Sequence, residues 1–338
     1  MQFEYTPPQT ILEEAFGGHR CINAFGPVTA GDDERFLDFL SRSSIPVRTD
    51  VYIDSSGGHV ETAINIGRAV RDNWFSTHVG QYVIDYQAPY ELEGFLKPRR
   101  FIEGSCISAA TLLYLGGRLR YLSKSARFGV HQFSFRDPSP SHVGRSQILS
   151  SRIARYISDM GIAPEFLEIS ASVESNEIKL VDHDKLHELG IVTDGQTPVT
   201  WTVQSRNNTL YVRAERDSLY GHHKLMLGFV KPDFYLHAVI ESQGRESHLT
   251  QFPLVELVVG QNDGRIVDLS GRCTRHIHGI YTNVFSKLST TEANDLAFSD
   301  GFGLRVRGGP DADMFLGIAP MSTSGGEDLI RSFVHSLS

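Results

Sequence analysis

The sequence has few cysteines and no long apolar run. Its three cysteines, Cys21, Cys106 and Cys273, are odd in number and far apart, so we expect no disulfide framework. No stretch approaches the ~20 consecutive apolar residues that cross a bilayer, which excludes an integral membrane protein. The first eight residues lack the basic and apolar regions of a secretory signal. These absences together predict a cytoplasmic protein with no membrane partner.

Positive charge is also scarce. The 40 acidic residues outnumber the 32 basic ones, and no basic block typical of nucleic-acid binding occurs. We therefore expect no nucleic-acid partner. The sequence contains neither a P-loop nor a G-x-G-x-x-G segment, and we predict no cofactor.

The composition is that of an ordinary globular chain, and 338 residues favour two domains. Residues 1–197 alternate strand-like and helix-like patterns, which predicts an α/β domain. Residues 198–338 predict a smaller, mostly-β domain in which only the tail, 326–337, is helical. Its first two strands flank Asn207-Asn208, a signal for a tight hairpin turn.

Within the first domain, apolar spacing and turn residues place the expected elements. Asp32 and Asp33 are candidate caps of one helix, and Asp182 is the candidate cap of a short helix ended by Gly190. Residues 81–100 form a long irregular stretch, and long loops are often functional. The expected strands are 20–25, 51–53, 119–122 and 128–133, and the other expected helices are 63–70, one opening at 104–110 and one starting near Ser141.

Three segments of this domain carry the residue types that nucleophilic catalysis needs. Such catalysis requires an exposed hydroxyl or thiol, a base that accepts its proton, and donors for the developing oxyanion. Ser108 lies in the first turn of the helix that follows Gly104, where free amides and the helix dipole favour a nucleophile. The Gly57-Gly58 turn opens the backbone to a substrate carbonyl. His131 is centred in an apolar strand and is the candidate base.

At these residues the chain resembles the Clp protease proteolytic subunit and its crotonase-fold relatives. The resemblance covers about residues 20–195 and implies a crotonase/Clp-like spiral α/β domain. It implies Ser108 as nucleophile, His131 as general base, and backbone amides near Gly57, Gly58 and Ala109 as the oxyanion hole. It further implies a serine peptidase that cleaves a peptide or protein substrate and assembles as a homo-oligomer. The matching segments are Ile53-Asp54-Ser55-Ser56-Gly57-Gly58, Gly104-Ser105-Cys106-Ile107-Ser108-Ala109 and Val130-His131-Gln132.

The acid of the implied triad is its least defined member. The family's aspartate position falls on Ile178. Glu177, one residue away, is the expected third member, and it needs a bulge or a shift to reach the histidine. Glu174 and Asp182 are the alternatives.

The same residues also have structural interpretations. Ser108 is followed by two alanines, which fits small-residue packing under a helix, and His131 fits a core histidine in a fold that has lost its activity. A catalytically inactive Clp-like binding or scaffold protein is therefore the alternative function. Acyl-CoA chemistry, which the crotonase fold also hosts, ranks third. Cys106 is expected to be a buried free cysteine rather than the nucleophile.

Two groups of residues have spacings that metal sites use. His183 and His187 are four residues apart on a predicted helix, and Cys273, His276 and His278 lie close together in the β-rich domain. Neither group matches a zinc pattern such as H-E-x-x-H. We therefore predict no metal site and assign the two helical histidines to a hydrated face.

Overall fold

The chain forms two compact units, Met1–Gly195 and Gln196–Ser338, and both mix strands with helices. Within the described part of the chain, no helix combines the length and the apolar character needed to cross a membrane. The structure is a computed structural model that describes residues 1–15, 20–88, 96–134, 142–206, 209–262 and 264–337.

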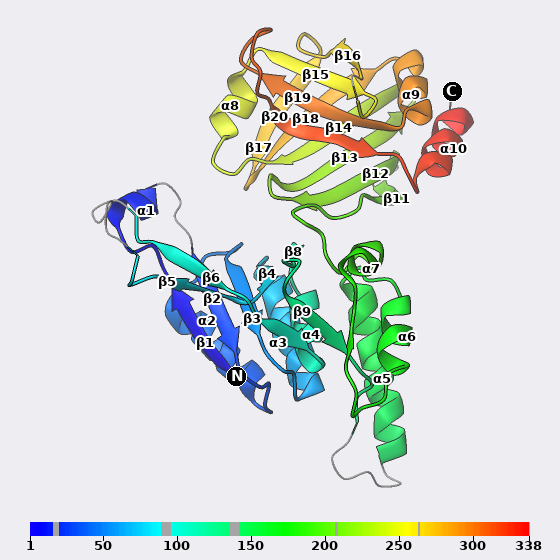
Figure 1. The fold of residues 1–338 in the computed structure, drawn as a ribbon. Coiled ribbons are helices and arrows are strands. Elements are labelled where there is room, and N and C mark those ends of the chain that lie inside the picture. Colours follow the sequence, from blue (N-terminus) through cyan, green and yellow to red (C-terminus); the bar gives the residue numbers. More distant parts are fainter. Residues whose placement is uncertain (16–19, 89–95, 135–141, 207–208, 263, 338) are drawn as a thin grey trace. The chain divides into compact units, whose positions relative to one another are not determined.

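The first unit contains two sheets and a hairpin (Figure 1). Its strands are β1 (Gln2–Thr6), β2 (Cys21–Phe25), β3 (Asp50–Asp54), β4 (Ser76–Val79), β5 (Gln81–Ile84), β6 (Arg99–Ile102), β7 (Ser105–Ile107), β8 (Arg120–Tyr121), β9 (Arg127–Val130) and β10 (Lys179–Leu180). The larger sheet has the order β1-β2-β3-β4-β8 and is parallel except for β1. In the smaller sheet, β10-β9-β7, β7 is parallel to β9 and β10 is antiparallel to it.

The helices of this unit cover the sheets, and three of them pack closely against one another. They are α1 (Ile11–Ala15), α2 (Asp32–Ser43), α3 (Val60–Asp72), α4 (Ala109–Leu115), α5 (His142–Asp159), α6 (Glu165–Ala171) and α7 (His183–Glu188). Helices α3 and α4 meet at two glycines, since a Cβ atom on Gly116 would lie 2.1 Å from the carbonyl oxygen of Gly67. The Tyr156 hydroxyl of α5 donates a 2.7 Å hydrogen bond to Leu112 of α4. Helix α4 therefore contacts α5 at Leu112 and α3 at its C-terminal end.

The apolar pattern accounts for several of these elements. Val51 and Ile53 alternate with half-buried residues along β3, and both are fully buried. On α3, Ala63 and Val70 belong to the buried stripe that the helical spacing predicts. The side chain of Asp182 accepts the amide of Asp184 at 2.9 Å, so the predicted cap of α7 is confirmed.

Three local predictions are wrong. The helix expected to open at 104–110 begins only at Ala109, because Ser105–Ile107 form strand β7 and Ser108 precedes the first helical turn. Asp32 does not cap α2 from outside the helix, because the cap residue is Gly31 and the buried Asp32 carboxylate instead accepts from the amino group of Met1 at 2.7 Å. The ends of the 81–100 stretch are not irregular, because β5 and β6 pair antiparallel there. Residues 89–95 lie outside the described residues.

The second unit contains two antiparallel sheets, β11-β12-β13-β14-β18-β17 and β16-β15-β19-β20. Its elements are β11 (Thr200–Arg206), β12 (Thr209–Ser218), β13 (Gly221–Val230), β14 (Asp233–Glu241), α8 (Glu246–Gln251), β15 (Leu254–Val259), β16 (Arg265–Asp268), β17 (Cys273–His278), β18 (Tyr281–Leu288), α9 (Thr290–Phe298), β19 (Gly301–Arg307), β20 (Leu316–Ser322) and α10 (Glu327–Leu337). Apolar residues of both sheets form one core, with Leu225 and Leu236 from the first and Leu257 and Leu304 from the second.

The expectation that only the tail of this unit is helical is wrong. Helix α8 precedes β15, and α9 follows β18. The predicted first hairpin is confirmed in its strands, because β11 and β12 pair antiparallel with Arg206 opposite Thr209. The turn residues Asn207 and Asn208 lie outside the described residues.

Candidate functional site

Three strand ends of the first unit meet around Ser108. The chain after β3 pairs with β7, since Ser55 donates its amide to Ser105 at 2.7 Å and accepts the amide of Ile107 at 3.0 Å. Strand β7 in turn pairs with β9, and the Ser108 amide donates a 2.8 Å hydrogen bond to the carbonyl oxygen of Gly129. The carboxyl ends of β3, β7 and β9 therefore lie side by side.

Ser108 has a strained backbone. It connects β7 directly to α4 with φ 57° and ψ −129°, a backbone conformation that residues other than glycine rarely adopt. Such strain costs about 1–3 kcal/mol and concentrates at functional sites. In α/β-hydrolases, a sharp strand-to-helix turn of this kind exposes the hydroxyl of the nucleophilic serine. Simple packing of a small residue does not require this conformation.

The first turn of α4 offers donors beside Ser108. The Ala109 amide donates to no described residue, because it belongs to the unpaired first turn of the helix. Gly57 approaches this turn closely, since a Cβ atom added there would lie 2.9 Å from the Ala109 nitrogen and 2.7 Å from the Ser108 Cβ. Only a glycine fits between the two segments.

The amides of Gly57 and Gly58 differ in their partners. The Gly57 amide donates to the Ser55 hydroxyl at 3.1 Å. Gly58 lies opposite Val28 in a parallel bridge whose hydrogen bonds are made by the residues on either side of Gly58. In such a bridge the N–H of the middle residue points away from its partner strand. The Gly58 amide donates to no described residue and is the free donor of the pair.

His131 is half-buried and lies just after β9, so the prediction that it is centred in a strand over 128–133 is wrong. Residue pairing between β7 and β9 ends at Ile107 and Gly129, so Ser108 and His131 follow the ends of neighbouring parallel strands. The Nδ1 atom of His131 is buried and has no hydrogen-bond partner among the described residues.

Among the described residues, none of the candidate acids forms a hydrogen bond with that nitrogen. Glu174 and Glu177 are both exposed, and the Glu177 amide donates to the Glu174 carbonyl oxygen at 3.0 Å. The Asp182 carboxylate is used as the cap of α7. Because Lys179 pairs with Val130 in antiparallel register, the next position places Ile178 opposite His131. An isoleucine therefore stands where the resemblance expects the acid.

Cys106 is a poor nucleophile. Its side chain is fully buried in the core of the first unit. Burial raises the pKa of its thiol well above the ordinary value. The reactive thiolate is therefore disfavoured at neutral pH.

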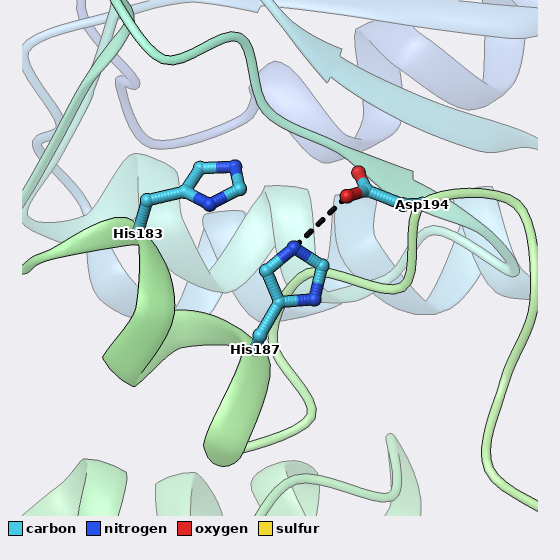
Figure 2. Close-up of side chains that lie close together, drawn as sticks. All are labelled: His183, His187 and Asp194. Atoms are coloured by element: carbon cyan, nitrogen blue, oxygen red, sulfur yellow. Dashed lines mark ion pairs between the residues drawn. The ribbon is translucent and has the colours of Figure 1, made fainter.

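Figure 2 shows a cluster that the sequence analysis missed in part. His183 and His187 project from α7, and Asp194 follows in the chain after that helix. One ligand atom from each of the three side chains lies within 4.8 Å of the other two. Asp194 was missed because it lies seven residues after His187 in an irregular segment, where no spacing rule points to it. The second predicted group does not assemble, since Cys273 and His276 alternate along β17 and point to opposite faces.

The second unit carries a pocket of about 590 Å³ on one face of its six-stranded sheet. Its lining includes Arg213 and Lys224, together with Tyr235 and Phe285, whose ring centroids are 5.0 Å apart. Glu215 forms an ion pair with Arg213 at 3.0 Å. No motif in the sequence marked this pocket.

Comparisons with known proteins find a distant likeness among solved structures. No protein family matches the chain, and no curated protein does. Among the solved structures that match is a point mutant of ClpP1 from Listeria monocytogenes, with a TM-score of 0.36 and 18% sequence identity. The match covers 54% of this chain and 94% of that one.

Proposed function

We propose that the first unit is a Clp-like serine peptidase of crotonase-type fold. Ser108 is its nucleophile and His131 is its general base. The amides of Gly58 and Ala109 form the oxyanion hole, and Gly57 supplies the close contact that brings the two segments together. The substrate is a peptide or protein.

The observation that carries this proposal is the strained turn at Ser108. The residue combines a positive φ, a position between a strand and a helix, and a neighbouring helical amide without a partner among the described residues. Close packing of Gly57 against the same turn adds a second backbone segment with a free amide. These features support an exposed nucleophile beside oxyanion donors.

The proposed reaction follows from these positions. The Ser108 Oγ attacks the peptide carbonyl carbon while His131 accepts its proton. The resulting oxyanion receives hydrogen bonds from Gly58 and Ala109, each worth about 3–4 kcal/mol in comparable sites. His131 then gives its proton to the leaving amine, and the acyl group remains on Ser108. Water, deprotonated by His131, hydrolyses this ester and regenerates the hydroxyl.

Glu177 is the proposed orienting carboxylate for His131. It is the acid nearest in sequence to Ile178, the residue opposite His131. A local shift of this exposed segment would turn its carboxylate to Nδ1. Such a partner holds the imidazole in the tautomer that accepts a proton at Nε2.

The test is hydrolysis of fluorogenic peptides by the full chain. We expect Ser108→Ala and His131→Ala each to lower kcat at least about a thousandfold, because both residues act as one unit. Ser150→Ala, which alters an exposed serine of α5, is the matched control and should keep wild-type activity. Activity that is equal in wild type and both active-site variants would overturn the proposal.

A second function, a catalytically inactive Clp-like binding or scaffold protein, is favoured by two observations around His131. His131 Nδ1 lacks a partner among the described residues, and Ile178 stands opposite this histidine. An inactive protein of this kind would bind peptides beside the Ser108 turn without cleaving them, and Ser108→Ala would leave peptide affinity and turnover unchanged. Assembly as a homo-oligomer stays a prediction that sedimentation analysis of the full chain would test.

A further inference from the structure

The side chains of His183, His187 and Asp194 converge on one point. The two histidines lie on one face of α7, and in Figure 2 the His187 ring points at the Asp194 carboxylate while the His183 ring lies farther from it. The ring centroids are 4.8 Å apart, and the His187 Nε2 lies 2.9 Å from an Asp194 carboxylate oxygen. Two imidazoles and one carboxylate are a donor set that zinc prefers.

The contacts of His183 leave a nitrogen available as a ligand. Its Nε2 lies 3.2 Å from the carbonyl oxygen of Leu122. When this nitrogen carries the proton and donates to Leu122, the lone pair is on Nδ1. Metal-binding histidines are commonly oriented in this way by a backbone carbonyl on the other ring nitrogen.

Hydrogen bonds hold both backbone segments of the cluster, helix α7 and the segment that carries Asp194. Helix α7 is capped by Asp182. The amides of Thr193 and Asp194 donate to the Arg120 carbonyl oxygen at 2.9 and 3.3 Å. The buried Arg120 guanidinium donates in turn to the carbonyl oxygens of Gly190 and Ile191 at 2.7 and 2.8 Å. Both the backbone and the side chain of Arg120 in β8 thus hold the segment between α7 and Asp194.

We propose that His183, His187 and Asp194 bind one zinc ion, with solvent at the fourth position. Ligands at about 2.1 Å from a tetrahedral ion are roughly 3.4 Å from each other. One ring nitrogen of each histidine and one Asp194 oxygen already lie within 4.8 Å of one another, and rotation of the partly exposed His183 ring turns its Nδ1 toward the ion. The bound ion takes the place of the hydrogen bond between His187 and Asp194, and any proton on the imidazole leaves to solvent.

The alternative is an ordinary surface ion pair. His187 and Asp194 by themselves are explained by such a pair, and it requires nothing of His183. Zinc binding requires all three side chains, so the loss of His183 distinguishes the two interpretations. The site is independent of the proposed peptidase chemistry, because it uses none of the same residues.

The test is zinc binding by the full chain after removal of metal with a chelator, measured by calorimetry and by metal analysis of the dialysed protein. We expect one zinc ion per chain and a rise in melting temperature with zinc. His183→Gln, His187→Gln and Asp194→Asn should each weaken the affinity at least about tenfold. Asparagine suits Asp194 because that residue has φ 43°. His278→Gln, at an exposed position of β17, and Ser108→Ala are controls that should bind zinc like wild type.

Three results would overturn the proposal. The first is no stoichiometric binding by wild type at about 100 μM free zinc, a level well above the Kd of structural zinc sites. The second is unchanged affinity in His183→Gln with loss only in the other two variants. The third is loss of binding in the His278 control. Melting curves in chelator, which should coincide for all variants, separate lost ligands from lost folding.

Discussion

The Ser108 amide donates its hydrogen bond to Gly129, two residues before His131. This bond joins two segments that are distant in sequence, because it continues the pairing of two neighbouring parallel strands, β7 and β9. The proposed nucleophile and base therefore follow the ends of adjacent strands. Rigid elements of this kind position reacting groups better than mobile loops do.

We predict that relief of the strain at Ser108 stabilises the protein at the expense of function. Ser108→Gly should raise the free energy of unfolding by about 1 kcal/mol, because glycine adopts positive φ without steric cost. Ser108→Ala keeps the strain and should change stability by less than about 0.5 kcal/mol. Urea unfolding of the three proteins measures the difference. Equal stability of the glycine and alanine variants would contradict a strained turn.

Gly57 should tolerate no side chain. A Cβ atom there would meet the Ile107 carbonyl oxygen at 2.5 Å, and φ is 92°. Gly57→Ala should lower the free energy of unfolding by about 2–4 kcal/mol and abolish turnover, because the Ser108 turn must move. Gly31→Ala is the matched control, with φ 87° and open space around the added atom. It should cost only about 1–2 kcal/mol.

The comparison of these two glycine variants is read by urea unfolding together with the peptide assay. Similar losses of stability in both would mean that backbone conformation alone, and not the contact with Ser108, requires glycine at position 57.

A carboxylate placed opposite His131 should increase activity. Ile178→Asp puts an acid at the position that faces His131 across β9 and β10. Because the wrong tautomer of a catalytic histidine costs up to about 10⁴ in kcat, we expect a gain of at least about tenfold. Ile178→Asn has the same shape without the charge and should give no gain. Glu177→Gln should lower the residual wild-type activity, with Glu174→Gln as its control.

This gain must depend on the proposed nucleophile. Adding Ser108→Ala to the Ile178→Asp protein should remove it, as measured by kcat on the same peptide. An equal gain in the aspartate and asparagine variants would show that the acid does not act through His131.

Two adjacent histidines should give the second unit a stability maximum near pH 6.5. Burial opposes the charged form of His222, but Asp217 at 3.0 Å and Glu215 at 2.7 Å outweigh it and raise its pKa from 6.5 to about 9. Its contribution is complete below pH 6.5 and is lost as the pH rises through about 9. Burial, with the charges of Arg216 and His222, lowers the pKa of His223 to about 4. The contribution of His223 is present above pH 6.5 and is lost as the pH falls toward 4.

The free energy of unfolding should fall by roughly 1–3 kcal/mol on the alkaline limb, above pH 6.5, and by a similar amount on the acid limb, below pH 6.5. One substitution should remove each limb. Trp201 lies in the second unit and Trp74 in the first, so Trp74→Phe leaves a fluorescence signal for the second unit alone. In that background, His222→Gln should flatten the alkaline limb and His223→Gln the acid limb. A monotonic dependence of the unfolding free energy on pH between 5 and 9 would contradict the opposed shifts.

Local features of the fold could be predicted from the sequence. The cap at Asp182 and the buried alternation of Val51 and Ile53 depend on a few neighbouring residues, and the structure confirms them. Helix α9 was missed although its signal is local. The side chain of Ser289 and that of Glu292, three residues later, form a capping box at its start.

Other features depend on contacts between distant segments. The antiparallel pairing of β5 with β6 joins the two ends of the stretch 81–100, and neither end has a strong strand pattern by itself. Asp32 was a plausible cap by residue type, but its carboxylate is held by the amino group of Met1. Asp194 lies near the two histidines on a segment that hydrogen bonds with Arg120 hold against β8. No pattern of residue spacing in the sequence predicts these contacts.

The most direct test of the central claim is labelling with a fluorophosphonate probe, followed by mass spectrometry of the digested protein. An activated serine beside an oxyanion hole reacts with this probe, whereas a packed serine does not. The account predicts a single adduct on Ser108 in wild type and a rate of labelling that falls sharply in His131→Ala. Absence of the adduct from wild type, or an equal rate of labelling in His131→Ala, would contradict it.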